Sequence, residues 1–188
     1  FNGTVNDFTV TDLKVEMEGG GFSGTVSGRM TGIPEVESTT VKGKVKGCRI
    51  TSKGLSKFVS YWMTDGKLDI SSLAPSETFH ISGDIDGTLN NMILNPKITS
   101  RIGQASGKNI RIDNILSEDA PLKISGEIRT NNLDVGKIID TDIVGPTTLT
   151  VTADATFGDE DSPIKVNISQ LDVDRLHFYG YDYTGISG

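Results

Sequence analysis

The sequence predicts an all-β protein: an elongated, curved antiparallel sheet with one or two short helices. Three observations lead to this prediction. Glycine makes up 22 of the 188 residues, about 12% against an average near 7%, whereas aromatic residues make up only 6%. Val, Ile, Thr and Ser occur in short runs, which favours strands. A short strand-like unit also recurs along the chain. Because few side chains are large and apolar, we expect a thin core.

The recurring unit is an apolar residue, any residue, glycine, any residue and a second apolar residue. It occurs as "FNGTV" from Phe1, "FSGTVSGRM" from Phe22, "VKGKVKGCR" from Val41, "ISGDIDGTL" from Ile81 and "ISGEIRTNNL" from Ile124. The spacings cluster near one or two times roughly twenty residues, the length of two strands and two turns. We therefore predict repeated hairpins or a meander, in one unit over residues 1–188 with sub-repeats near 1–78 and 79–188. Because the sequence opens and closes within strand-like runs, we expect it to be a piece of a longer protein.

Side chains alternate between the two faces of a strand, and here the glycines fall in step with the apolar residues. In residues 79–89, one face takes Phe79, Ile81, Gly83, Ile85, Gly87 and Leu89, and the other takes His80, Asp84 and Asp86. Residues 41–47 and 122–129 sort in the same way. Glycine removes side-chain volume from the apolar face and adds curvature. Either a covering element packs against the resulting hollow, or the hollow stays open for a slender apolar ligand.

Two segments have helical patterns. Residues 52–63 place Leu55, Phe58, Val59 and Trp62 at helical spacing. Residues 133–140 are expected to form a turn or two, with Asp134 near the start. Both segments are short, so helices lying over one end of the sheet are favoured over a membrane-surface role.

The charge of the chain argues against a nucleic-acid partner. The net charge is −7 and the pI is about 4.8, whereas a nucleic-acid binder needs a basic surface. The local basic cluster of Lys42, Lys44, Lys46 and Arg49 is better explained as a solvated strand face. The single cysteine, Cys48, cannot form an internal disulfide. The sequence contains no signal peptide or membrane-spanning stretch.

The candidate motifs for metal and cofactor binding each lack residues or elements that such sites need. Asp84 and Asp86 could begin a calcium loop, but the position-six glycine, the closing glutamate and the helical flanks are missing. His80 and His177 belong to no set with zinc spacing. "GGGFSG" at 19–24 matches a dinucleotide motif, but a strand follows it instead of a helix, so a loose hairpin turn is expected. The sequence therefore predicts no metal site and no cofactor.

The sequence also argues against an enzyme. It contains no Gly-x-Ser-x-Gly nucleophile elbow. The acidic run "DEDS" at 159–162 lies between Gly158 and Pro163, which is typical of a solvated turn between strands. Tyr179, Tyr181 and Tyr183 alternate with other residues, so an aromatic cluster on one face is expected.

The C-terminal part of the chain resembles the TamB/AsmA-like envelope proteins of the Bacteroidetes type. The stretch "ISGEIRTNNLDVGKIID" at 124–140 is similar to the family's strand, linker and "nLdvGkll" turn. "IVGPTTLTVTADATF" at 143–157 is similar to the strand pair that follows, and "LDVDRLHFYGYDYTGISG" at 171–188 to the start of the next repeat. Residues 1–121 fit only in the style of their repeats.

The resemblance implies a fold and a function. The fold would be an open trough with an apolar interior, called a β-taco. The parent protein would be anchored in the inner membrane and span the periplasm, where such proteins are implicated in carrying phospholipid between membranes. It also implies support of outer-membrane protein assembly through a barrel partner that binds outside these residues.

On this interpretation, lipid acyl chains would lie against inward-facing apolar residues, and glycines would keep the track open. The expected lining residues are Phe22, Val26, Met30, Val41, Val45, Phe79, Ile81, Ile85, Leu89, Leu122, Ile124, Ile128, Leu149, Val151 and Phe157, with Gly24, Gly43, Gly83 and Gly126 as groove glycines. The alternative is a closed β-sandwich acting as an adhesin or as a glycan- or protein-binding surface module. A parallel β-helix is a third architecture, although uneven glycine spacing counts against it.

Overall fold

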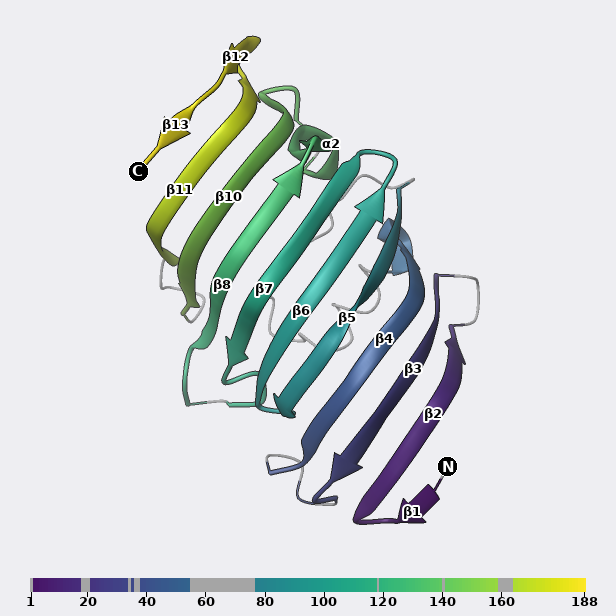
Figure 1. The fold of residues 1–188 in the computed structure, drawn as a ribbon. Helices are drawn as coiled ribbons and strands as arrows, with labels where there is room; N and C mark the ends of the chain where they lie inside the picture. Colours follow the sequence, from purple (N-terminus) through teal and green to yellow (C-terminus); the bar gives the residue numbers. More distant parts are fainter. Residues whose placement is uncertain are drawn as a thin grey trace.

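The computed structural model describes residues 2–17, 21–33, 35, 38–54, 77–117, 119–139, 141–158 and 164–188. Within this part of the chain, thirteen strands form one curved, open, antiparallel sheet, which confirms the predicted fold class (Figure 1). The strands are β1 (Asn2–Thr4), β2 (Asp7–Glu16), β3 (Phe22–Thr31), β4 (Thr40–Thr51), β5 (Thr78–Thr88), β6 (Asn91–Ser100), β7 (Gly103–Asp113), β8 (Leu122–Asn131), β9 (Leu133–Asp134), β10 (Val144–Phe157), β11 (Lys165–Phe178), β12 (Tyr181–Tyr183) and β13 (Ile186–Ser187).

The sheet is a meander, because the long strands pair in chain order from β2 to β8 and then through β10 to β11. Every pairing is antiparallel, which excludes the parallel β-helix. β4 and β5 pair from Thr40↔Thr88 to Thr51↔Thr78, so the two expected sub-repeats share one continuous sheet. All the described strands belong to this sheet, whereas a sandwich needs two.

A short helix, α2 (Val135–Ile139), follows β9 as expected from residues 133–140. Asp134 caps it: its Oδ1 accepts the Lys137 backbone N–H at 3.2 Å, and its Oδ2 pairs with Lys137 Nζ at 3.2 Å. Residues 52–54 are helical, and the rest of the helix predicted over 52–63 lies outside the described residues. Of the helices described, none is long and apolar enough to cross a membrane.

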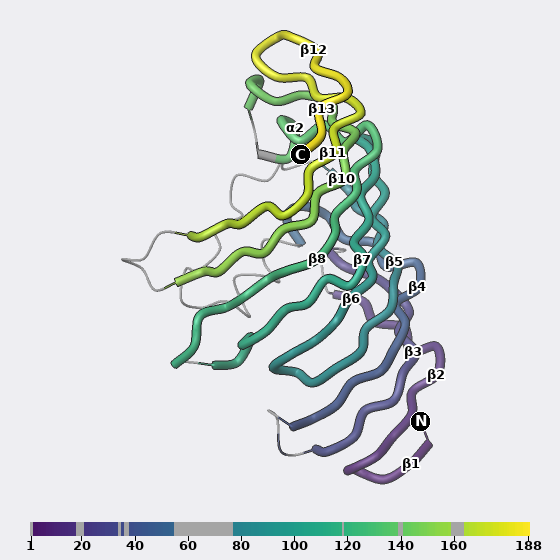
Figure 2. Tube along the Cα trace, turned by 60° about the vertical axis from the view of Figure 1, so that its left-hand side comes forward, coloured from purple at the N-terminus to yellow at the C-terminus, as the bar shows by residue number. Residues whose placement is uncertain are grey.

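Bulges within the long strands contribute to the curvature of the sheet (Figure 2). Register shifts occur beside Asp12 in β2, Gly47 in β4 and Asn109 in β7, whose φ angles are 48°, 57° and 51°. A bulge adds one residue to its strand, which bends the strand and increases its twist. The predicted alternation is therefore wrong at Gly47: it is the exposed bulge residue, and Cys48 takes its place on the apolar side.

The core is thin, as the composition predicts. Only six apolar residues are buried in the described part of the chain, and the molecule exposes 12135 Å². A compact monomer of 20.1 kDa would expose about 8,700 Å². The central cluster is Ile50, Phe79 and Ile102, against which Leu133 of β9 and Ile138 of α2 pack. α2 therefore covers one end of one face of the sheet.

Candidate functional site

One face of the sheet is apolar from the first long strand to the last. Directly opposed residues in antiparallel strands point to the same face. A single row of opposed pairs crosses all nine long strands and contains only apolar residues and one glycine: Phe8, Met30, Val41, Gly87, Met92, Ile112, Ile124, Ala155 and Val166. We call this set the cross-strand row, and the side of the sheet that carries it the apolar face.

The apolar face holds fourteen of the fifteen lining residues expected from the sequence. They lie on β3, β4, β5, β8 and β10, in the same register as the cross-strand row. Leu89 is the exception, because β5 ends at Thr88, where the hydroxyl oxygen accepts the Asn91 N–H at 2.9 Å. Leu89 therefore lies in the turn between β5 and β6, and its placement on the strand face was wrong.

Sequence reasoning missed much of the same face. Four strands add apolar residues in register with the row: Val10, Leu13 and Val15 of β2, Leu94 and Ile98 of β6, Ala105 and Ile110 of β7, and Ile168, Leu171 and Val173 of β11. In β2, β7 and β11 a bulge interrupts the alternation, and Asp12 and Asn109 mark two of those bulges.

Burial along the apolar face is uneven. Ile50, Phe79 and Leu122 are buried at the strand ends, whereas most of the cross-strand row is half-buried. Exposure is highest on β11, where Val166 and Ile168 are 60% and 54% exposed. The described residues thus leave apolar side chains partly accessible to solvent along the length of the sheet.

The four expected groove glycines lie on the apolar face, and the neighbouring backbone comes close to each. A Cβ at Gly83 would lie 2.4 Å from the Asn95 carbonyl oxygen, and one at Gly126 would lie 2.8 Å from the Asn109 oxygen. At Gly43 the nearest atom is the Ser27 oxygen at 2.9 Å, and at Gly24 it is the Cys48 Cα at 3.0 Å. These glycines therefore permit close strand packing as well as leaving the face without side chains there.

The opposite face is polar and carries paired charges. Lys42 Nζ lies 3.1 Å from Asp86 Oδ2, and Lys44 Nζ lies 3.6 Å from Asp84 Oδ1. The two aspartates of the rejected calcium loop thus pair with lysines of β4 on a solvated face. Arg29 Nε donates to Asp7 Oδ1 at 2.8 Å, and this hydrogen bond lowers the pKa of Asp7 below its ordinary value.

The polar face also has an open depression of about 240 Å³ over β6, β7 and β8. Lys97, Gln104 and Arg129 are among its lining residues. Glu127 already pairs with Arg129, at 2.9 Å between Oε1 and Nε. The depression combines amide, hydroxyl and cationic groups.

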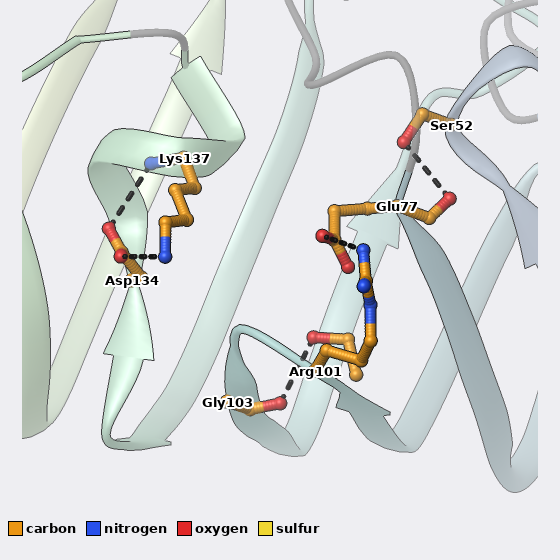
Figure 3. A network of polar contacts seen from close by, with 7 residues as sticks. Ser52, Glu77, Arg101, Gly103, Asp134 and Lys137 are labelled. Atoms are coloured by element: carbon orange, nitrogen blue, oxygen red, sulfur yellow. Dashed lines mark hydrogen bonds and ion pairs between the residues drawn. The ribbon is translucent and has the colours of Figure 1, made fainter.

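A network of polar contacts connects the strand ends that lie near the central cluster (Figure 3). The Glu77 backbone oxygen accepts hydrogen bonds from the Ser52 N–H at 3.0 Å and the Ser52 hydroxyl at 3.3 Å. The Glu77 side chain is buried, and its Oε1 lies 3.0 Å from Arg101 Nη2. Its Oε2 has no partner among the described residues. These contacts join the end of β4, the start of β5 and the turn between β6 and β7.

The tyrosines near the C-terminus do not form the expected cluster on a single strand face. Tyr181 and Tyr183 share a face of β12, but Tyr179 lies in the preceding turn with a φ of 49°. Its ring packs edge-on against the ring of Phe178, with the ring centroids 4.7 Å apart. On the other face, His177 Nδ1 lies 3.0 Å from Asp182 Oδ1. This hydrogen bond lowers the pKa of Asp182.

Neither a reactive thiol nor a metal-binding cluster occurs among the described residues. Cys48 is buried, and desolvation raises the pKa of its thiol, which disfavours the nucleophilic thiolate. The described ranges contain no group of three or more His, Cys, Asp or Glu side chains that could hold a metal ion. The apolar face is therefore the most extensive candidate site.

Comparisons with known proteins add nothing to this geometry. No family model matches the chain, and searches of curated proteins and of solved structures found no match either.

Proposed function

We propose that this chain is a segment of a TamB/AsmA-like protein of the bacterial envelope, and that its apolar face carries phospholipid acyl chains between the inner and outer membranes. The cross-strand row is the observation that supports the proposal. It runs from Phe8 to Val166 without one polar residue, while charged pairs such as Lys42–Asp86 occupy the opposite face. One side of the sheet thus suits lipid, and the other suits water.

The dimensions and energetics of the face fit an acyl chain. Nine strands about 4.8 Å apart extend over roughly 40 Å. One acyl chain spans half of the bilayer's hydrocarbon core of about 30 Å, so it would fit along the row. Shielding each methylene from water is worth about 0.8 kcal/mol. Because these contacts are non-directional, a chain would slide between equivalent positions, while its headgroup stays in water.

The parent protein would work in the periplasm, anchored in the inner membrane. Its partners would be lipid acyl chains and, through regions beyond these residues, a barrel protein of the outer membrane. Neither partner would require a cofactor or a catalytic group. The proposal rests on the form of the face together with the resemblance of residues 124–188 to the family.

Photocrosslinking from matched positions tests the proposal. A photoreactive residue would replace Ile85 on the apolar face or its neighbour Asp84 on the polar face, in protein produced in a bacterial envelope. Mass spectrometry should find phospholipid attached at position 85 and not at position 84. Equal labelling at both positions, or labelling at neither, would contradict lipid carriage and favour a surface module that binds protein or glycan.

A second pair of variants tests whether the face must be apolar. Ile124→Asp places a charge in the cross-strand row, and Ser125→Asp places one on the opposite face of the same strand. Ile124 is half-buried, so the charge would remain hydrated and the fold should survive, as circular dichroism would show. Co-purifying lipid should fall strongly for Ile124→Asp and remain for Ser125→Asp. Unfolding of Ile124→Asp alone would indicate a sealed core instead.

A further inference from the structure

The depression on the polar face lies over three strands in the middle of the sheet. It has a volume of about 240 Å³, and β6, β7 and β8 each have a neighbouring strand on both sides (Figure 1). Ser106 of β7 lines the depression and is directly opposed to Lys97 of β6 and to Arg129 of β8. A short side chain therefore lies between two long cationic side chains, which leaves an open space above it.

The side chains around this space are cations and hydrogen-bond donors. Lys97 and Arg129 are positively charged, and hydroxyl or amide groups come from Thr99, Gln104, Ser106 and Asn131. No Asp or Glu is among the described residues that line the depression. Lys97 also forms no ion pair with a described residue. The depression therefore suits an anion.

Glu127 holds one side of the Arg129 guanidinium and leaves the other side free. Arg129 Nε donates to Glu127 Oε1 at 2.9 Å, and the Glu127 side chain is only 23% exposed. The terminal nitrogens of Arg129, Nη1 and Nη2, have no hydrogen bond to a described residue. A guanidinium held at Nε in this way can still donate two parallel hydrogen bonds to the oxygens of a phosphate or carboxylate.

The wider polar face of the central strands also attracts anions. Strands β4 to β8 contain nine Lys and Arg residues but only four Asp and Glu residues. All of them lie on the polar face, in register with the pairs Lys42–Asp86 and Ser106–Arg129. The whole chain has a net charge of −7, so positive charge is concentrated on these strands. Such a field raises the local concentration of an anionic ligand.

We propose that this depression binds a phosphate group, carried either by a lipid headgroup or by a soluble phosphate ester. The phosphate would lie over Ser106, where Lys97 and Arg129 reach it from strands about 4.8 Å away on either side. An esterified phosphate has three strong acceptor oxygens, so it can use the guanidinium, the ammonium and the hydroxyl at once, whereas a carboxylate has two.

The size and position of the depression are consistent with this ligand. Pockets for drug-sized ligands begin at roughly 300 Å³, so a space of about 240 Å³ suits a small charged group. The depression lies on the face opposite to the cross-strand row, because Ser106 and Arg129 alternate with Ala105 and Ile128 of the apolar face. The inference therefore does not depend on acyl chains binding to that face.

Titration of the 188-residue chain with inorganic phosphate tests the site. In nitrogen–proton NMR spectra, the side-chain amide signals of Gln104 and Asn131 and the backbone amide signal of Ser106 should shift and reach saturation. Sodium chloride at the same ionic strength should leave these signals in place. Equal shifts with chloride, or shifts spread evenly over the polar face, would overturn the proposal, because they would indicate general screening of charge.

Variants that remove one charge each locate the site. Lys97→Gln and Arg129→Gln each remove a charged donor, so the affinity for phosphate should fall about tenfold or more. Both side chains are exposed, so circular dichroism spectra should not change. Lys123→Gln removes a charge from the same face of β8 but outside the depression, and it should change the affinity by less than about twofold. Equal losses in Arg129→Gln and Lys123→Gln would contradict a defined site.

A conservative variant tests the role of the guanidinium. Arg129→Lys keeps the positive charge but loses the paired donors, so its affinity for phosphate should lie between those of the wild type and Arg129→Gln. An affinity equal to that of the wild type would show that Arg129 contributes charge alone and would overturn the bidentate contact.

Vesicle flotation distinguishes the two sources of phosphate. For a lipid headgroup, the wild type and Lys123→Gln should float with phosphatidylglycerol vesicles, whereas Lys97→Gln and Arg129→Gln should not. For a soluble ester, glycerol 3-phosphate should saturate the NMR shifts while no protein floats. Either result supports the site, and phosphate binding that fails in both assays overturns it. Lipid crosslinking from position 85 reports on the opposite face and would succeed or fail separately.

Discussion

Two glycines of the apolar strands have positive φ angles for different reasons. Gly47 has a φ of 57° with no atom within 4 Å of its would-be Cβ, so only the backbone conformation restricts it. Gly83 has a φ of 154°, and its would-be Cβ lies 2.4 Å from the Asn95 carbonyl oxygen and 2.9 Å from the Pro96 Cα. Asn tolerates the left-handed conformation at Gly47, whereas no side chain fits at Gly83.

Asparagine substitutions at these two positions should therefore differ in effect. Gly47→Asn should change the free energy of unfolding by no more than about 0.5 kcal/mol, as for an exposed surface site. Gly83→Asn should cost about 1–3 kcal/mol from backbone strain alone, with the overlap at Asn95 in addition. Urea unfolding followed by circular dichroism would measure both. Equal stability of the two variants would show that backbone proximity at Gly83 is unimportant.

At the scale of strands, the same kind of hydrogen bond recurs where a strand backbone departs from regular geometry. At four of the five described non-glycine residues with positive φ, a side chain of the adjacent strand accepts the backbone N–H, whereas the Tyr179 N–H donates to the Ile143 backbone oxygen. Asp12 donates to Ser27 Oγ at 3.0 Å, and Asn109 donates to Asn95 Oδ1 at 2.8 Å. Asn114 and Asn132 donate likewise to Asn91 and Thr148. The bulges that bend the sheet are thus supported from the neighbouring strand.

Removing one such acceptor should weaken the strand pair. Asn95→Ala leaves the Asn109 N–H without its side-chain partner, so we expect a loss of about 1 kcal/mol in the free energy of unfolding. Asn131→Ala, whose side chain has no hydrogen bond to a described residue, is the control and should be close to neutral. Hydrogen exchange at Asn109 should also accelerate only in Asn95→Ala. Unchanged exchange there would mean that the Asn95 side chain does not protect the Asn109 N–H.

At the scale of the whole molecule, the sheet is a single layer. Each long strand is held by its two neighbours, and burial is concentrated at Ile50, Phe79 and Ile102. This arrangement explains why 188 residues expose 12135 Å² of surface. Among the described residues, the small core leaves the apolar face partly accessible to solvent, whereas a closed globule of this size would bury such a face.

Solution scattering should detect this shape. A compact domain of 188 residues would have a radius of gyration near 16 Å. The open sheet should give a clearly larger value at concentrations where the chain is monomeric. A radius near 16 Å would mean that the sheet closes on itself in solution.

The sequence alone determined the fold class and the identity of the two faces over much of the sheet. Period-two alternation predicted the apolar side at 41–45, 79–87 and 122–128, because side-chain direction follows the strand backbone locally. Asp134 likewise indicated the start of α2, because helix capping is a local interaction.

Only the tertiary structure decided where the alternation changes phase and how far the apolar face extends. In β4 the bulge at Gly47 turns Cys48 and Ile50 inward, where strict alternation would have placed Arg49. The cross-strand row could not be read from any one segment, because it depends on the register between nine strands. Register is set by pairing between residues far apart in the chain, and one added residue reverses every side chain beyond it.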